Sequence, residues 1–130
     1  QNTKIEISFP QISIKAELNN SITARRIINK LPLKGKANIW GEEVYFIIPV
    51  EADLESDARD ILKKGEIAFW PPGRAFCIFG GPTPISQTDQ IKAAGPVSII
   101  GQVVSKLEDL KKVTNGDEVR ISLDLDNEKR

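Results

Sequence analysis

The sequence predicts a mainly β protein: a closed eight-stranded barrel with two or three short helices, forming one domain over residues 1–130. Three observations predict it. Apolar and polar residues alternate in several short stretches, which is the period of a half-buried strand. Residues typical of turns separate these stretches. Helical spacing of apolar residues occurs only near residues 22–31, 56–64 and 107–113. Antiparallel strands on this scale leave no exposed edges when they close into a barrel, and we expect that closure.

The first two strands form a predicted hairpin. Ile5, Ile7 and Phe9 alternate with polar residues, and the same alternation continues from Ile12 to Leu18. The segment Phe9-Pro10-Gln11 between them is typical of a turn. If such alternating segments line one barrel, four isoleucines from the first and the last strands should be buried: Ile5, Ile7, Ile99 and Ile121.

A helix is predicted after this hairpin. The side chain of Asn20 or Ser21 can accept a hydrogen bond from the first turn and cap the helix. Pro32 ends it, because proline lacks the amide hydrogen that a continuing helix needs. Its inward residues follow the i, i+3, i+4, i+7 spacing: Ala24, Ile27, Ile28 and Leu31.

The next segments predict a second hairpin and a second helix. Apolar strands within residues 37–48 flank the turn Gly41-Glu42-Glu43. A short helix is expected over residues 56–64, where Ser56 or Asp57 can serve as the cap and two apolar residues face inward.

The segment Gly65–Pro84 is unusually rich in aromatic residues, proline and glycine. It predicts two short apolar strands, Glu66–Trp70 and Ala75–Phe79, joined by a Pro71-Pro72-Gly73 turn. The second strand continues into a rigid loop over residues 80–84. Proline has no amide to offer a neighbouring strand, and glycine lets a ligand or another backbone approach closely. We therefore expect this segment to line the mouth of a pocket.

The last third of the chain predicts two more strands with a short helical segment between them. Residues 85–95 show no clear period, which favours a loop. The remaining expected elements are a strand over residues 96–104, one or two helical turns over 107–113, a turn at 115–117, a strand over 119–125 and a frayed tail over 126–130.

Two segments resemble motifs of the cyclophilins. Residues 69–81 have the length of the cyclophilin motif Phe-His-Arg-Val-Ile-Pro-Gly-Phe-Met-Ile-Gln-Gly-Gly. Residues 99–111 are similar to a later motif, Val-Phe-Gly-Lys-Val-Val-Glu-Gly-Met-Asp-Val-Val-Lys. The order of elements is similar as well, so the resemblance implies a barrel that opens with a hairpin and a helix. The first motif is matched at Phe69, Phe76, Ile78, Gly80 and Gly81.

The resemblance does not extend to the cyclophilin catalytic residues. The arginine that binds the substrate carbonyl aligns with Pro71, the substrate-binding glutamine with Phe79, and the histidine beside the arginine with Trp70. The whole chain instead resembles a group of small single-domain archaeal and bacterial cyclophilin-like proteins, through Trp-Pro-Pro-Gly at 70–73 and Gly-Pro-Thr-Pro at 81–84. The resemblance thus implies the fold, with prolyl isomerase activity absent or weak.

Five residues of the central segment are candidates for binding a ligand. Arg74 would be the polar anchor, because its planar guanidinium suits a carboxylate or a carbonyl group. Alternation places Phe76 and Cys77 on opposite faces of their strand, so one shared pocket requires the preceding turn to bend round the rim. The alternative is structural, with Phe76 in the core and Arg74 paired with a surface acid. The candidates are Trp70, Arg74, Phe76, Phe79 and Thr83.

The sequence argues against several kinds of chemistry. It contains no histidine, which excludes Ser-His and Cys-His couples and zinc sites of ordinary composition. Cys77 lies in an apolar strand and is expected to be a buried, inert thiol. The acidic segment 124–128 lacks the glycine of a calcium loop. We expect no cofactor and no metal.

The charges balance, with 18 basic and 18 acidic residues, so no overall field attracts nucleic acid or a membrane. No apolar run approaches the roughly 20 residues that span a bilayer. A single cysteine fits a reducing compartment, and we place the protein in the cytoplasm. The chain begins at Gln1 without a methionine, so we expect that an upstream segment was removed or left out.

Charges of each sign are grouped along the chain. The basic group offers a contact for an acidic partner or RNA, but a solvated surface is favoured because no aromatic residues are interleaved with it. The basic group comprises Arg25, Arg26, Lys30, Lys34 and Lys36, and the acidic group comprises Glu51, Asp53, Glu55, Asp57 and Asp60.

Three functional hypotheses remain. The first is a cyclophilin-like barrel that binds a peptide or a small ligand in a pocket beside residues 70–74 and 76–83. The alternative is a peptidyl-prolyl cis-trans isomerase with a rearranged active site. The third is an interaction module that uses the grouped surface charges.

Overall fold

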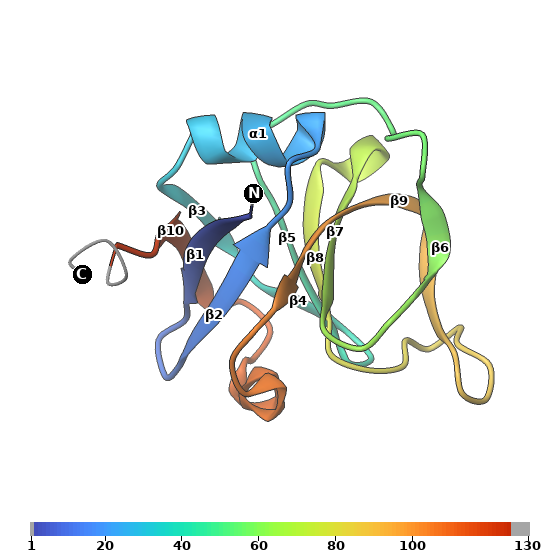
Figure 1. Cartoon of the computed structure of the whole chain (residues 1–130). Helices are drawn as coiled ribbons and strands as arrows, with labels where there is room; N and C mark the ends of the chain where they lie inside the picture. Colours follow the sequence, from blue (N-terminus) through green and yellow to red (C-terminus); the bar gives the residue numbers. More distant parts are fainter. Residues whose placement is uncertain (1, 126–130) are drawn as a thin grey trace.

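The computed structural model describes residues 2–125, which form a curved antiparallel sheet with one α-helix and two 3₁₀ helices (Figure 1). The predicted tail over residues 126–130 lies outside the described residues. The elements are β1 (Thr3–Ser8), β2 (Ser13–Leu18), α1 (Ile22–Asn29), β3 (Leu33–Lys36), β4 (Asn38–Trp40), β5 (Glu43–Ile47), β6 (Arg59–Leu62), β7 (Glu66–Trp70), η1 (Pro71–Gly73), β8 (Ala75–Phe79), β9 (Ile91–Val103), η2 (Leu107–Lys112) and β10 (Glu118–Leu123).

The strands pair in the order β3-β10-β1-β2-β9-β7-β8-β5-β4, and β6 pairs with β9 beside this series. The mainly β prediction is confirmed, but the closed eight-stranded barrel is not. Ten strands are present in the described residues, and the series has two unpaired ends, β3 and β4. The backbone of Gly35 in β3 approaches β5 closely, since a Cβ atom there would lie 3.2 Å from the carbonyl oxygen of Ile47. The sheet therefore curves so that β3 packs against β5, but no ladder of hydrogen bonds joins these two strands.

The main core fills the inside of the curved sheet. The rings of Phe46 and Phe76 stack there with centroids 5.0 Å apart. Ile5, Ile7 and Ile121 are buried as predicted, because β1 pairs with both β2 and β10 and turns the same face inward. Helix α1 covers one end of this core and η2 lies near the other (Figure 1).

A second apolar layer lies on the other face of β7 and β8. Buried Ala68, Cys77 and Phe79 pack there, covered by residues of β6 and the first half of β9. Ile99 belongs to this layer and is half-buried, so the prediction that it would be fully buried is wrong. Strand β9 is long enough to serve both layers, pairing with β6 near its start and with β7 and β2 further along.

Helix α1 forms as its local sequence predicts. The hydroxyl of Ser21 accepts a hydrogen bond from the Ala24 amide at 3.1 Å, which confirms one of the two predicted caps. The carboxylate of Glu55 adds a tertiary contact, accepting from the amide and the hydroxyl of Thr23 at 2.9 and 2.7 Å. The helix ends at Asn29, before Pro32.

The helix predicted over residues 56–64 is wrong, because Arg59–Leu62 is strand β6. Its pairing with β9 supplies hydrogen bonds that a short isolated helix could not match. The guanidinium of Arg59 also holds the strand against β7, donating to both carboxylate oxygens of Glu66 at 2.9 and 2.7 Å.

Other boundaries move for the same reason. Strand β9 begins at Ile91, inside the predicted loop over residues 85–95, because pairing with β6 extends it. The short strand β3 was not predicted, since its sequence Leu-Lys-Gly-Lys carries one apolar residue, and pairing with β10 fixes it. The turn at 115–117 is confirmed, with Gly116 at a φ of 93°.

Within residues 2–125, no helix is both long and apolar enough to cross a membrane.

Candidate functional site

A pocket forms on the outer face of β4, β5, β8 and β7, and the strand register explains its composition. Glu43 lies opposite Phe79 and Tyr45 lies opposite Cys77 where β5 pairs with β8. Since residues directly opposite each other share a face, these four side chains point to one side of the sheet. On the flanking strands, Trp40 lies opposite Glu43 and Trp70 lies opposite Ala75.

The first half of β9 provides the facing wall. Together with β6 it forms a two-stranded arm beside β7 and β8 (Figure 1). The pocket is open to solvent and has a volume of about 250 Å³. Its floor is buried, whereas three aromatic side chains at its edge are half-buried. The lining residues are Trp40, Glu43, Tyr45, Trp70, Ala75, Cys77, Phe79, Ala93, Ala94 and Val97.

The Pro71–Gly73 turn sets the position of Trp70. It forms the short helix η1, after which Arg74 adopts a left-handed conformation with a φ of 50°. The indole of Trp70 lies against Gly73 so closely that a Cβ atom there would come within 2.7 Å of the ring. A residue with a side chain at position 73 would therefore displace the Trp70 ring from this position.

The glycine-proline loop positions Glu43 from the other side. Gly80 donates its amide to the carbonyl of Glu42, and Glu42 donates its amide to the carbonyl of Pro82, both at 2.9 Å. Gly41 packs against the same loop, where a Cβ atom would lie 2.8 Å from the Pro82 carbonyl oxygen. The loop over residues 80–84 was predicted to approach a ligand or another backbone closely, and the backbone that it approaches is that of the β4–β5 turn.

Glu43 is the unusual residue of the pocket. It is an acidic side chain with only 5% exposure, in mostly apolar surroundings. Burial raises the pKa of its carboxyl group to about 7, and a hydrogen bond with Cys77 partly offsets that rise. Burial, followed by the nearby Glu43 charge, raises the pKa of the Cys77 thiol well above its usual value. The thiol is thus kept protonated and unreactive, consistent with the predicted inert cysteine.

The five predicted site residues do not all meet at this pocket. Trp70 and Phe79 line it. Phe76 is fully buried in the main core, on the opposite face of β8. Arg74 lies outside the lining, and its guanidinium contacts the Glu51 carboxylate at 2.6 Å on the surface. Phe76 and Arg74 therefore lie where the alternative to a binding role places them, in the core and in a surface ion pair.

Thr83 is buried and fastens the loop that leads into β9. Its hydroxyl donates to the carbonyl oxygen of Lys92 at 2.5 Å. The hydroxyl of Ser86 accepts from the amides of both Thr83 and Lys92 at 2.9 Å. Thr83 thus supports the wall of the pocket from behind and does not line it.

Eight of the ten lining residues were missed from the sequence, and three of these carry aromatic or acidic groups: Trp40, Glu43 and Tyr45. A signal was present, because Glu43 and Tyr45 alternate with apolar Val44 and Phe46 along one strand. Local patterns favour a turn at Glu43, and only the pairing of β5 with β8 places it opposite Phe79.

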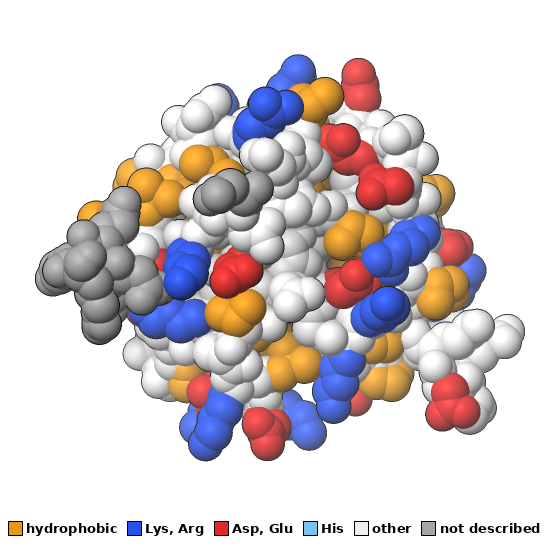
Figure 2. Space-filling model, in the orientation of Figure 1, with side chains coloured by type: hydrophobic (Ala, Val, Ile, Leu, Met, Phe, Trp, Pro, Cys, Tyr) orange, Lys and Arg blue, Asp and Glu red, His pale blue; other side chains and the backbone are white. Residues whose placement is uncertain are grey.

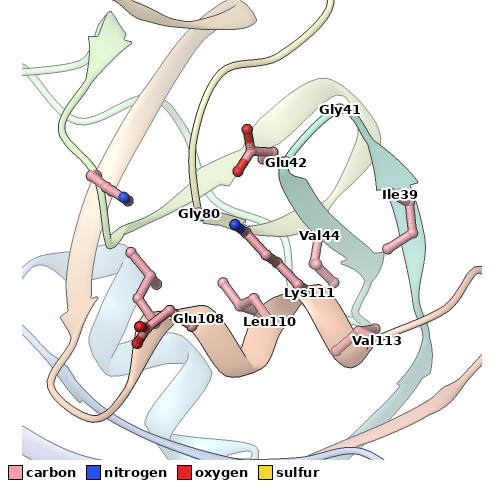
Figure 3. A pocket seen from close by; sticks show the side chains of 11 residues that line it. Ile39, Gly41, Glu42, Val44, Gly80, Glu108, Leu110, Lys111 and Val113 are labelled. Carbon is pink, nitrogen blue, oxygen red and sulfur yellow. The ribbon is translucent and has the colours of Figure 1, made fainter.

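A second depression, of about 390 Å³, lies between the β4–β5 turn and η2 (Figure 3). Val44, Leu110 and Val113 contribute apolar surface, and the side chain of Lys111 extends over it toward Glu42. Lysine and glutamate residues both line it, so it favours no sign of charge. We regard it as the groove where η2 packs against the sheet.

Within residues 2–125, no cluster of three or more His, Cys, Asp or Glu side chains is arranged to hold a metal ion.

Comparison with known proteins identifies the family. Residues 3–122 match the profile described as Cyclophilin-like. The chain belongs to the cyclophilin-like family. The solution structure of the hypothetical protein AF2241 from Archaeoglobus fulgidus is similar over 95% of both chains, with 36% sequence identity and a TM-score of 0.81. None of the curated proteins matches the chain.

A more distant structure shares the fold alone. The structure of McbB in complex with tryptophan aligns with 92% of this chain and 44% of its own, with a TM-score of 0.65 and 18% identity. The cyclophilin-like domain thus corresponds to less than half of that protein. The resemblance found in the two sequence motifs is confirmed at the level of family.

Proposed function

We propose that this cyclophilin-like domain binds a small ligand, or one side chain of a peptide, in the pocket on the outer face of β5 and β8. One observation carries the proposal: three half-buried aromatic side chains surround a hollow whose floor is already buried. Preformed apolar hollows with a few polar groups are typical of ligand sites. A volume of about 250 Å³ suits a compact group and is too small for a long peptide segment.

The sequence resemblance supports the same location. Phe79, which aligns with the cyclophilin substrate-binding glutamine, and Trp70, which aligns with the histidine beside the catalytic arginine, both line the pocket. The proposed ligand therefore occupies the face that the resemblance assigns to substrate.

Isomerase activity is the less favoured alternative. Cyclophilin chemistry needs an arginine donor, and neither Pro71 nor any basic residue lines the pocket. Arg74 is near Ala75 in sequence but is engaged by Glu51. Binding without isomerisation therefore fits these residues better.

Intrinsic fluorescence tests binding directly, because both tryptophans of the chain line the pocket. We expect members of a set of capped dipeptides and small amines or carboxylates to change the emission in a saturable way. Tyr45→Ala should weaken the response. Ile47→Ala is the matched control, since Ile47 lies two residues further along β5 and does not line the pocket. An unchanged emission across the whole set, from correctly folded protein, would refute the proposal.

A further inference from the structure

We propose that the pocket selects an organic cation, an alkylammonium group, which Glu43 neutralises while Trp40, Tyr45 and Trp70 contact it through their ring faces. This inference rests on the proposed ligand-binding function and adds the chemical class of the ligand. Three observations carry it: the isolation of Glu43, the arrangement of the aromatic rings and the size of the pocket.

Glu43 has no basic partner. None of the ten lining residues is lysine or arginine, and Glu43 forms no salt bridge among the described residues. Its polar neighbour is the thiol of Cys77, a weak donor whose single proton is also directed to the Ala75 carbonyl oxygen at 3.7 Å. An acid that is 95% buried without a cation is costly to keep charged. A ligand ammonium group would supply the missing partner.

The aromatic residues surround this acid. Trp40 is directly opposite Glu43 on β4, and Tyr45 is two residues along β5 on the same face. Trp70 lies beyond Ala75 on β7. All three are half-buried and line the pocket, so part of each side chain remains accessible to a ligand. Aromatic faces carry negative partial charge and attract cations, most strongly when water is excluded.

The composition of the pocket disfavours an anionic ligand. An anion would meet the Glu43 carboxyl and the ring faces with no basic lining residue to offset them. The sequence predicts Arg74 as the anchor for a carboxylate or a carbonyl group, but the charged group that lines the pocket is an acid, Glu43. A volume of about 250 Å³ accommodates a trimethylammonium or lysine-like terminus with a short stem.

The charge of Glu43 depends on pH and so should cation binding. The titratable groups that line the pocket are Glu43 and Tyr45 from β5 and Cys77 from β8, and none becomes positive. A bound cation favours the ionised carboxylate. Binding should therefore strengthen as pH rises from about 6 to about 8, with a proton released at the lower pH.

The test compares choline with 3,3-dimethylbutan-1-ol, a neutral molecule of nearly the same shape. Tryptophan emission and calorimetry are measured for both, the latter in two buffers of different ionisation enthalpy to count protons. We expect choline to bind about tenfold more tightly than the alcohol. Glu43→Gln should remove most of that preference and the proton release, whereas Glu43→Asp should keep part of both.

Glu42→Gln is the control, since Glu42 is the adjacent residue, is exposed and does not line this pocket. It should leave the preference unchanged. Equal or tighter binding of the alcohol, or an undiminished choline preference in Glu43→Gln, would overturn the cation inference while leaving ligand binding in place. Absence of any response to either probe or to the wider ligand set would overturn both proposals together.

Discussion

Glu43 is an acidic residue whose side chain the fold buries away from water. Its carboxyl group is buried beside Cys77 and Phe79, and burial raises its pKa from 4.5 to about 7. The folded state therefore holds a proton that the unfolded chain releases between these two values. The stability from this group is complete below about pH 4.5 and is lost as pH rises through about 7.

We predict that Glu43→Gln abolishes this part of the pH dependence. Because one pKa unit corresponds to about 1.4 kcal/mol, the variant should exceed the wild type in free energy of unfolding by up to about 3 kcal/mol above pH 7. Urea denaturation across the pH range measures this difference. Glu42→Gln should behave like the wild type, and an unchanged slope in Glu43→Gln would contradict the assignment.

Arg74 leads to a prediction about catalysis. Both members of its pair with Glu51 are exposed, with side-chain exposures of 55% and 74%. We expect prolyl isomerase activity to be absent or very weak, because Pro71 occupies the position of the cyclophilin arginine and Arg74 is outside the pocket. An assay with a proline-containing peptide measures it. Turnover that Arg74→Ala abolishes would reverse this expectation and identify Arg74 as a relocated catalytic group.

At the scale of elements, the antiparallel pairing of β2 with β9 depends on one glycine. Gly101 pairs with Leu18, and a Cβ atom on Gly101 would overlap the carbonyl oxygen of Glu17. Backbone atoms cannot move aside as a flexible side chain can, so the two strands would have to separate.

We predict that Gly101→Ala lowers the free energy of unfolding by about 3 kcal/mol or more, measured by thermal or urea denaturation. Gly95→Ala is the control on the same strand, because its nearest contact would be an ordinary 3.6 Å to the Trp70 indole nitrogen. Comparable stabilities for the two variants would show that β2 and β9 do not approach as described.

The ion pair between Arg59 on β6 and Glu66 on β7 makes the free energy of unfolding depend on pH with the opposite sign. Burial raises the pKa of Glu66, but the hydrogen bonds from Arg59 and from the Lys63 amide outweigh it and lower the pKa overall. The folded carboxylate therefore binds its proton less readily than the unfolded one. Its contribution to stability is present above about pH 4.5 and declines as pH falls below that value.

We predict that Glu66→Gln destabilises the fold by about 1 kcal/mol at neutral pH, a modest value because the Arg59 side chain is partly exposed. The difference from wild type should diminish at about pH 3, because the carboxyl group of the unfolded wild-type chain takes up a proton below about pH 4.5. Denaturation at both pH values measures it. An equal loss of stability at neutral pH and at about pH 3 would mean that packing, and not charge, holds β6 in place.

At the scale of the whole molecule, no salt bridge joins the basic group to the acidic group among the described residues, and the two segments meet through other polar contacts. Arg26 donates to the backbone carbonyl of Glu51 at 2.9 Å, and Glu55 holds the start of α1 through Thr23. The acidic segment is thus folded against the basic helix. On the face that Figure 2 shows, basic and acidic side chains are interspersed, with hydrophobic ones between them.

We predict that the double change Arg25→Ala and Lys30→Ala leaves ligand binding at the pocket unchanged and alters stability by no more than about 0.5 kcal/mol, because both side chains are exposed. Fluorescence titration and denaturation measure the two quantities. A pull-down at low and high salt completes the test: capture of a partner that high salt and this double change both abolish would favour the interaction-module hypothesis.

Local sequence alone determined much of the architecture. The opening hairpin, the cap of α1 at Ser21, the strands on either side of Pro71–Gly73 and the turn at Gly116 were all predicted, because alternation, capping and turn chemistry act over a few residues. Two cyclophilin-like motifs were also sufficient to indicate the family.

Tertiary structure decided whatever depends on pairing between distant residues. Residues 59–62 form a strand because β9 lies beside them, and the sheet meets itself by packing because Gly35 approaches β5 without pairing to it. The pocket is the clearest case. Glu43 and Phe79 are far apart in sequence and neither predicts the other, but the β5–β8 register sets them opposite each other on one face. A shift of that register by one residue would turn Glu43 to the other face, so the chemistry of the pocket is fixed by long-range strand pairing that local patterns do not specify.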